Sequence, residues 1–194
     1  MVVAVIEKFS EWYTEAENCK QINDVTEVCL ATADKNGKPS ARMVLLKSFD
    51  DNGFCFFTNY TGRKSNDIIA NPYAALCFYW NPLGKQIRIE GKVEKVSAQE
   101  SDDYFNSRAT DSKLGAWASK QSTELKSRTE FIEEIEKFRK KFEGKEIPRP
   151  EHWGGWRLVP TAVEFWEAEQ YRYHKRELYE KLPDGSWTNR LLFP

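Results

Sequence analysis

The chain has 194 residues, a length that predicts a single domain able to bury a core without disulfides or metals. Hydrophobic residues make up 40% and aromatic residues 14%, which is too apolar for a disordered chain. Basic residues number 29 and acidic residues 30, so the net charge of −1 lacks the basic excess of a typical nucleic-acid-binding protein.

The cysteines, the histidines and the lengths of the apolar segments indicate the expected compartment and whether a metal site is expected. The four cysteines form no C-x-x-C pair, and three of them lie in apolar strand-like segments, as buried reduced thiols do. With only two histidines, no zinc-ligand spacing arises. No basic, apolar leader and no apolar run of about 18 residues is present. We therefore expect a cytoplasmic protein with no metal, no membrane contact and no nucleic-acid partner.

The first half of the chain predicts one helix followed by strands with short connections. Apolar residues at helical spacing, including Phe9 and Trp12, predict a helix over 4–19. The dipeptide Asn36-Gly37 is a strong hairpin signal. A short helix is predicted over 62–70, because Pro72 disfavours its continuation. Strands are expected over 25–33, 40–48, 54–59, 73–80 and 85–96.

The second half predicts helices and then a return to strands. Ser97 with Glu100, and Ser127 with Glu130, have the spacing of a capping box and predict two helix starts. Further strands are expected over 155–159, 162–167, 171–179 and 187–192. The pattern predicts a mainly β fold, an antiparallel barrel with peripheral helices. We expect one domain over residues 1–194, with a helical insert at about 97–144.

Four basic residues in these elements suggest a phosphate site. Arg42 and Lys47 share a predicted strand, and Arg63 and Lys64 open a short helix whose N–H groups favour an anion. The alternative is that basic residues at a helix start are simply solvated. Strict strand alternation places Arg42 and Lys47 on opposite faces, so a bulge or two separate ligands would be needed.

Tyr104, Arg108 and Ser112 form a second polar group. Tyr104 and Arg108 are four residues apart, so they would share one face of a helix, and Ser112 follows shortly after. Together they could bind a phosphate through two hydroxyls and one guanidinium. An ordinary exposed helix face is the alternative.

A third group lies near the C-terminus. If 171–179 is a strand, Arg172, His174 and Arg176 project to one face, where they would repel one another without an anionic or polar ligand. An exposed strand face is the alternative. The chain has neither a G-x-G-x-x-G motif nor a P-loop, so a nucleotide-like cofactor would be held by other means.

Short motifs in consistent order over most of the chain resemble the pyridoxine/pyridoxamine 5′-phosphate oxidase family. Each motif alone is weak, whereas their order and spacing together are specific. The matching segments are RMVLLK at 42–47, FTN at 57–59, RK at 63–64, QIR at 86–88, AWAS at 116–119, QS at 121–122, WGG at 153–155, EFW at 164–166 and RYH at 172–174.

The resemblance implies an FMN-binding split β-barrel that works as a homodimer with FMN at the subunit interface. It also implies an enzyme of vitamin B6 metabolism, which oxidises pyridoxamine 5′-phosphate or pyridoxine 5′-phosphate to pyridoxal 5′-phosphate while oxygen is reduced to hydrogen peroxide. Two alternatives stay open: another flavin oxidoreductase on the same fold, or a non-catalytic protein that binds flavin or pyridoxal phosphate.

The resemblance also implies roles for individual residues. The implied FMN contacts are Arg42, Met43, Val44, Leu45, Leu46, Lys47, Phe57, Thr58, Arg63, Lys64, Gln86, Gln121, Ser122, Trp166 and Arg176. The implied substrate contacts are Lys47, Tyr104, Arg108, Ser112, Arg172 and His174. Among these, Arg172 and His174 are the expected catalytic pair, which would cover and orient the substrate ring. Lys175 stands where an acidic residue is expected, which leaves an altered substrate preference open.

Overall fold

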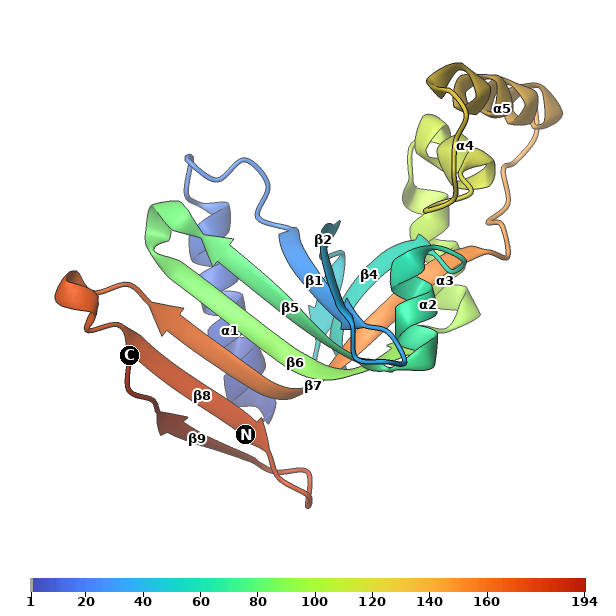
Figure 1. Ribbon diagram of the computed structural model, residues 1–194. Coiled ribbons are helices and arrows are strands. Elements are labelled where there is room, and N and C mark those ends of the chain that lie inside the picture. Colours follow the sequence, from blue (N-terminus) through green and yellow to red (C-terminus); the bar gives the residue numbers. More distant parts are fainter. Residues whose placement is uncertain (1) are drawn as a thin grey trace.

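The computed structural model describes residues 2–194 and contains one antiparallel sheet of nine strands, curled into a half-barrel (Figure 1). This arrangement confirms the predicted antiparallel barrel with peripheral helices. The strands are β1 (Glu27–Ala33), β2 (Pro39–Leu45), β3 (Ser48–Asp50), β4 (Gly53–Asn59), β5 (Tyr73–Trp80), β6 (Lys85–Lys95), β7 (Trp153–Glu167), β8 (Lys175–Lys181) and β9 (Trp187–Leu191).

The strand order is β2-β1-β5-β6-β7-β4-β3, and β8 and β9 extend the sheet from β7. β7 pairs with β4 through its first residues, up to Leu158, and with β8 through Ala162–Glu167. The backbone N–H of Lys47 donates to the carbonyl oxygen of Cys55 at 2.8 Å, which joins the chain after β2 to β4. This bond curls the sheet back toward its own edge and brings the end of β2 close to β4.

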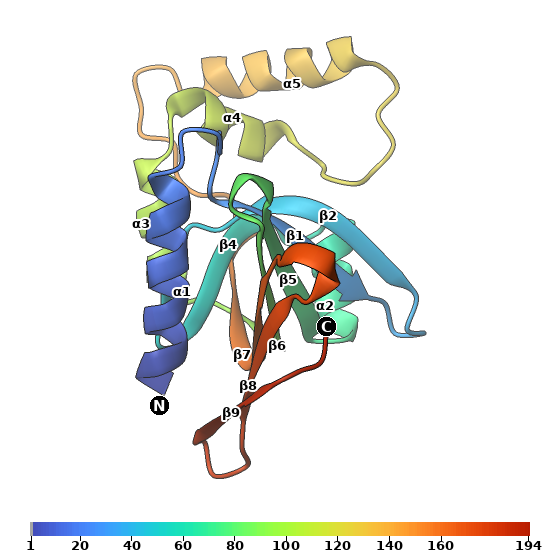
Figure 2. The ribbon, with the colours of Figure 1, turned by 90° about the vertical axis from the view of Figure 1, so that its left-hand side faces the viewer.

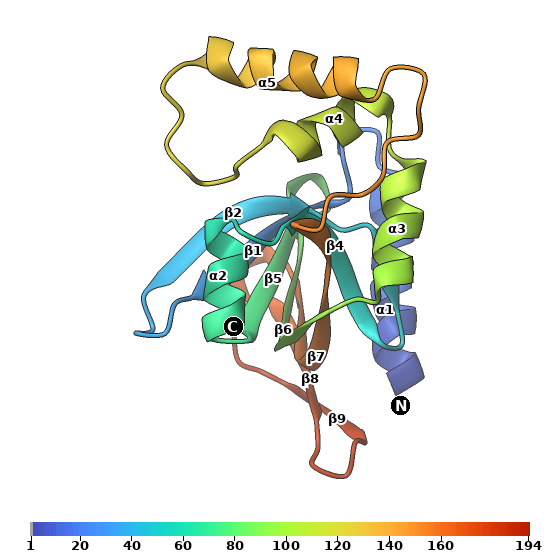
Figure 3. The same ribbon diagram turned by 90° about the vertical axis from the view of Figure 1, so that its right-hand side faces the viewer.

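Residues 2–194 contain five α-helices besides the sheet. α1 (Val2–Glu17) runs along one side of it, whereas α4 and α5 lie together beyond its end (Figure 2). Figure 3 shows α2 next to β1 and β2, and α3 along the side of the sheet. The remaining bounds are α2 (Arg63–Ala70), α3 (Ala98–Ser107), α4 (Thr110–Ala118), α5 (Arg128–Lys141) and the 3-10 turns η1 (Asn81–Leu83) and η2 (Gln170–Arg172).

The core lies between the inner face of the sheet and α1. Alternate residues of β1, β5, β6 and β7 point inward and are buried, as period-two alternation requires. Phe9 of α1 is fully buried, and its ring centroid lies 4.8 Å from those of both Phe49 and Phe54. The edge-to-face contacts fix α1 on the barrel.

Two predicted elements are wrong in detail. Segments 155–159 and 162–167 form the single strand β7, which continues through Pro160. The predicted strand over 171–179 begins only at Lys175, because Tyr171 (φ 56°) and Arg172 (φ 65°) take the left-handed conformation inside η2. Arg172, His174 and Arg176 therefore do not share one strand face.

The helical segment also differs from the prediction. α4 was not predicted, and it carries Ser112. Arg108 is the first residue after α3, with extended backbone angles, so it lies beyond the helix that carries Tyr104. All four cysteines have free thiols; Cys55 is buried and the other three are half-buried. In residues 2–194, no helix combines the length and the apolarity needed to cross a membrane.

Candidate functional site

A cavity of about 750 Å³ lies between the end of β2, the strand β4 and the helices α3 and α4. Its size is within the range of sites for small molecules. It brings together residues of two predicted groups. From the cofactor group it is lined by Met43, Val44, Leu45, Lys47, Phe57, Thr58, Lys64 and Gln121, and from the substrate group by Lys47, Tyr104, Arg108 and Ser112.

One wall of the cavity is built at the first turn of α2. The ammonium group of Lys64 donates to Oε1 of Gln121 at 2.6 Å and to Oγ1 of Thr58 at 3.1 Å. The backbone N–H of Arg63 donates to Oγ of Ser122 at 3.1 Å. These bonds attach the loop that carries Gln121 and Ser122 to the helix start, where the positive end of the helix dipole favours an anion.

The charges at this helix start favour an anionic ligand. Burial, together with the nearby positive charge of Arg42, lowers the pKa of Lys64. Burial likewise lowers the pKa of Arg42, and Arg63 adds to that effect. Three cationic groups therefore lie close to one another, and a phosphate among them would stabilise their charged forms.

Arg42 is held on the inner side of β2. Its Nη1 donates to Oγ1 of Thr32 at 2.7 Å and to the carbonyl oxygen of Leu30 at 3.2 Å. Thr32 in turn donates its hydroxyl hydrogen to Oδ2 of Asp67 at 2.7 Å. Asp67 belongs to α2, so this chain of bonds connects the helix to the sheet.

Lys47 lies past the end of β2, which ends at Leu45. The alternation of the strand therefore does not extend to Lys47, and no bulge is needed for its side chain to line the cavity. Leu46, which lies between Leu45 and Lys47 in the chain, is buried in the core, so its side chain does not reach the cavity.

Arg108 and Tyr104 line the opposite part of the cavity. Nη1 of Arg108 is buried and has no hydrogen-bond partner among the described residues. The guanidinium carbon lies 4.7 Å from the ring centroid of Trp153. Burial lowers the pKa of Arg108 and raises the pKa of Tyr104, so the Tyr104 hydroxyl stays protonated as a hydrogen-bond donor. An anion near these groups would supply the missing acceptor.

An aromatic stack supports this part of the cavity. The rings of Phe57 and Tyr104 lie 4.1 Å apart, and Trp153 stacks near both. Gly155 allows Phe57 to take this position, because a Cβ atom there would lie 2.7 Å from the Phe57 ring. Gly154 leaves room for the hydroxyl of Tyr60, which a Cβ would meet at 2.2 Å.

The remaining predicted residues gather around β6, β7 and β8. Gln86, Trp166 and Arg176 are neighbours across the three strands. The rings of Trp166 and His174 lie 4.6 Å apart. Nδ1 of His174 accepts a hydrogen bond from the backbone N–H of Glu169 at 3.1 Å. These contacts place the imidazole against the indole.

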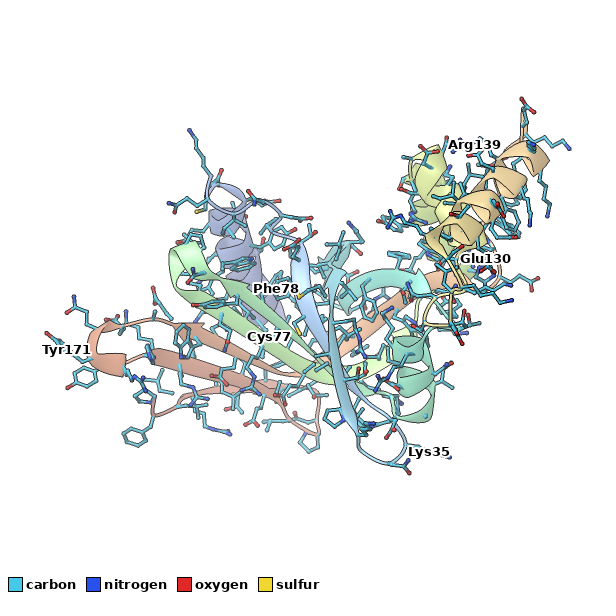
Figure 4. All side chains as sticks on the ribbon, turned by 45° about the horizontal axis from the view of Figure 1, so that its top comes forward. Lys35, Cys77, Phe78, Glu130, Arg139 and Tyr171 are labelled. Carbon is cyan, nitrogen blue, oxygen red and sulfur yellow. The ribbon has the colours of Figure 1, made fainter. Side chains whose placement is uncertain are left out.

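Neither this cluster nor Arg172 lines the cavity. In Figure 1 the turn η2 and the helices α4 and α5 lie on opposite sides of the molecule. Figure 4 shows the same separation between the labelled Tyr171 and the labelled Glu130 and Arg139 of α5. The cavity thus brings together Lys47 and Lys64 of the first predicted phosphate-binding group and all three residues of the second, Tyr104, Arg108 and Ser112. Arg42 and Arg63 lie near this site but do not line the cavity. Arg172 and His174 lie elsewhere in the chain.

Several lining residues were not predicted. Trp153 and Phe131 supply apolar surface, and Asn59 donates to the carbonyl oxygen of Ser119 at 3.0 Å, which ties β4 to the end of α4. Trp153 belongs to a motif of the resemblance, a signal that could have identified it. Asn59 likewise belongs to the FTN motif at 57–59. Phe131 gives no such signal, since its position depends on how α5 folds over the sheet. In residues 2–194, no three His, Cys, Asp or Glu side chains are arranged to hold a metal ion.

Comparison with protein families gives two matches. Residues 15–142 match the family model described as pyridoxamine 5′-phosphate oxidase. Residues 153–194 match the model described as the pyridoxine 5′-phosphate oxidase C-terminal dimerisation region. Together the matches include the cavity and the η2 segment.

Curated relatives are similar over nearly the whole chain. A pyridoxine/pyridoxamine 5′-phosphate oxidase from Pelagibacter ubique is 46% identical over 97% of this chain and 91% of its own length. The protein of the same name from Cupriavidus necator is 50% identical over 96% of this chain and 87% of its own length.

Solved structures share the fold. PhzG from Burkholderia lata, in complex with tetrahydrophenazine-1-carboxylic acid, has a TM-score of 0.91 and 30% identity, covering 97% of this chain and 92% of its own. A pyridoxamine 5′-phosphate oxidase-related, FMN-binding protein from Nostoc punctiforme has a TM-score of 0.70 and 20% identity, covering 87% of each chain.

Proposed function

The chain belongs to the pyridoxine/pyridoxamine 5′-phosphate oxidase family, and on this premise we propose that it is an FMN-dependent oxidase of phosphorylated B6 vitamers. Pyridoxamine 5′-phosphate, oxygen and water would give pyridoxal 5′-phosphate, ammonia and hydrogen peroxide. Pyridoxine 5′-phosphate and oxygen would give pyridoxal 5′-phosphate and hydrogen peroxide. The assignment of residues 1–194 to one domain with an insert at about 97–144, and of the protein to the cytoplasm, stays a prediction.

The observation that carries this proposal is the buried, unpartnered Nη1 of Arg108. A charged N–H donor that is buried without an acceptor is costly, and a phosphomonoester offers several charged acceptors at once. Lys47, Tyr104 and Ser112 line the same cavity, so three further donors can bind that phosphate. PhzG, at 30% identity, is in complex with a carboxylic acid that has no phosphate. The phosphate-binding set favours the vitamer over such a compound.

The residues at the start of α2 fit the phosphate of FMN. Lys64 and Arg42 form a cationic cluster at the positive end of the helix, and Gln121 and Ser122 belong to the loop bonded to it. When bound, FMN supplies the electron chemistry, since it takes two electrons from the substrate and returns them to oxygen. The protein binds and orients both ligands, so that the reacting atoms are held together by two anchored phosphates.

We further propose that the working enzyme is a homodimer whose site is completed across the interface. Arg172 and His174 lie far from the cavity of their own chain, so the partner subunit's Arg172 and the partner subunit's His174 would cover the substrate there. The match of 153–194 to a dimerisation region supports this arrangement. The consecutive left-handed residues Tyr171 and Arg172 also support it, because backbone strain is often kept where a loop tip has a function.

The vitamer phosphate provides a direct test. The kcat/KM for pyridoxamine 5′-phosphate should exceed that for pyridoxamine by at least about 100-fold, because a phosphate held by several charged donors contributes a few kcal/mol. Oxygen uptake and formation of pyridoxal 5′-phosphate would both be measured. Equal kcat/KM for the two amines would contradict the proposal. A yellow protein that oxidises neither phosphorylated vitamer would favour the non-catalytic alternative.

A further inference from the structure

We infer that Asp67 is a positioning residue for the cofactor phosphate, because it holds the guanidinium of Arg42 in place through the hydroxyl of Thr32. The inference rests on the proposed binding of FMN, since it concerns how tightly this chain binds that phosphate. It assigns a role to two residues that do not line the cavity.

The hydrogen bonds run in one direction from cation to anion. Thr32 and Asp67 are both buried, with 4% and 6% of their surface exposed. The Thr32 hydroxyl has one hydrogen, which it donates to Oδ2 of Asp67 at 2.7 Å. Its oxygen is then free to accept from Nη1 of Arg42, which lies at 2.7 Å. Asp67 therefore fixes the orientation of the hydroxyl that fixes Arg42.

The charge of Asp67 also allows the cationic groups to converge. Nη2 of Arg42 lies 3.6 Å from Oδ2 of Asp67. Arg63 and Lys64 lie close enough to Arg42 to repel it, whereas Asp67 stabilises its charged form. Because Nη1 is used by Thr32 and the carbonyl of Leu30, the other guanidinium N–H groups remain for a ligand. Without Asp67, Arg42 would be expected to move away from the other two cations.

Asp67 has a second effect of opposite sign, because its negative charge also repels a phosphate. Its removal would strengthen FMN binding if repulsion dominates and weaken it if the positioning of Arg42 dominates. The close Asp67–Thr32–Arg42 contacts favour positioning, since electrostatic interaction energy decreases with distance.

The test compares FMN with riboflavin, which has the same ring system and no phosphate. Dissociation constants of both flavins for the full chain would be measured by quenching of flavin fluorescence. For Asp67→Asn and Thr32→Val, we expect FMN to bind at least about tenfold more weakly, as for a lost charge-assisted hydrogen bond. Riboflavin should bind as it does to the unmodified protein. Thr32→Ser keeps the hydroxyl and should retain FMN affinity.

Asp51→Asn is the charge-matched control, because Asp51 is exposed in the turn before β4 and forms no ion pair in the described structure. It should leave FMN binding unchanged. Unchanged or tighter FMN binding in Asp67→Asn would overturn the inference. An equal loss of riboflavin and FMN binding would also overturn it, since that result indicates a purely structural role.

Failure of the Asp67 inference can be distinguished from failure of the proposed oxidase activity. If the unmodified protein binds FMN but oxidises no B6 vitamer, the proposed oxidase is wrong, and the FMN-to-riboflavin comparison still tests Asp67. If the unmodified protein does not bind FMN, both ideas are wrong.

Discussion

At the scale of single residues, Arg108 is the side chain whose surroundings most directly call for a ligand. Its Nη1 is buried without a hydrogen-bond partner among the described residues, while Trp153 stacks under the guanidinium. Burial of a charged donor without an acceptor is unfavourable until an anion binds. The free energy recovered on binding then contributes to affinity for the substrate.

Replacement of Arg108 by alanine should therefore weaken binding of the vitamer phosphate. We expect kcat/KM for pyridoxamine 5′-phosphate to decrease by about 10- to 100-fold, the range of a charged hydrogen bond. The dissociation constant of FMN should not change, because Arg108 lies on the other side of the cavity from α2. Steady-state oxygen uptake measures the first quantity, and an unchanged KM would remove Arg108 from the phosphate site.

The lowered pKa of Lys64 predicts how FMN binding depends on pH. Burial and the charge of Arg42 lower its pKa from the ordinary value of 10.5, so in the absence of FMN it becomes neutral at a lower pH than other lysines. Only the charged form attracts a phosphate. Above about pH 6, where the phosphate carries its second charge, FMN affinity should therefore be constant until the pH rises through this lowered pKa, and should then fall.

Titration of FMN at increasing alkaline pH would measure this decrease. The matched variant is Lys64→Arg, in which the side chain stays charged, and its affinity should be nearly independent of pH over the same interval. The same alkaline decrease in both proteins would show that another group is responsible.

Most residues of the cavity could be predicted from the sequence only through motifs. Strict strand alternation would place Arg42 and Lys47 on opposite faces of one strand. The structure avoids this, because β2 ends before Lys47. The role of Asp67 gives no local signal, since Thr32 is 35 residues away and meets it only when α2 packs against the sheet. Contacts of this range depend on the tertiary structure.

At the scale of elements, capping and turn residues in the sequence correctly predicted the start of a helix and the position of a hairpin. The capping box of Ser97 and Glu100 is present in the structure. Gly37 has a φ of 79°, as the hairpin signal requires. The strand β7 was not predicted as one element because Pro160 lacks an N–H group. It continues because its neighbour changes there, from β4 to β8.

The helix α1 depends on Phe9 for its attachment to the barrel. Phe9→Ala should lower the free energy of unfolding by about 3–5 kcal/mol, because it leaves a cavity among buried aromatic rings. Glu11→Ala, on the exposed side of the same helix, should change it little. Denaturant unfolding of both variants measures the difference. Equal stability of the two variants would contradict the packing described for α1.

At the scale of the whole molecule, one chain carries the predicted substrate-binding residues in two separate places. The cavity holds Lys47, Tyr104, Arg108 and Ser112, while Arg172 lies at η2, on the opposite side of the molecule (Figure 1). No sequence pattern could predict this separation, because residues on different elements give no indication of the distance between them. The left-handed backbone of η2 also could not be predicted from the local sequence, since a tyrosine such as Tyr171 rarely adopts this conformation.

A dimer with shared sites predicts complementation between two impaired variants. Arg108→Ala and Arg172→Ala chains, co-expressed with different tags, should form mixed dimers in which one of the two sites has neither substitution. With random pairing, the activity should recover to about a quarter of the unmodified level. Each variant alone should stay at about a tenth of the unmodified activity or below at subsaturating pyridoxamine 5′-phosphate.

If instead each chain completed its own site, every site in the mixed dimers would carry one substitution. Activity after co-expression would then remain at the level of the single variants. One rate measurement thus distinguishes the two arrangements, because mixed dimers purified through both tags should reach about half of the unmodified activity only if the sites are shared.

The claim that the chain oxidises a phosphorylated B6 vitamer through bound FMN is tested most directly by a visible spectrum of the protein without oxygen. Addition of pyridoxamine 5′-phosphate should remove the absorbance of the oxidised flavin, and admission of oxygen should restore it with formation of hydrogen peroxide. A flavin spectrum that neither pyridoxamine 5′-phosphate nor pyridoxine 5′-phosphate changes would contradict the account.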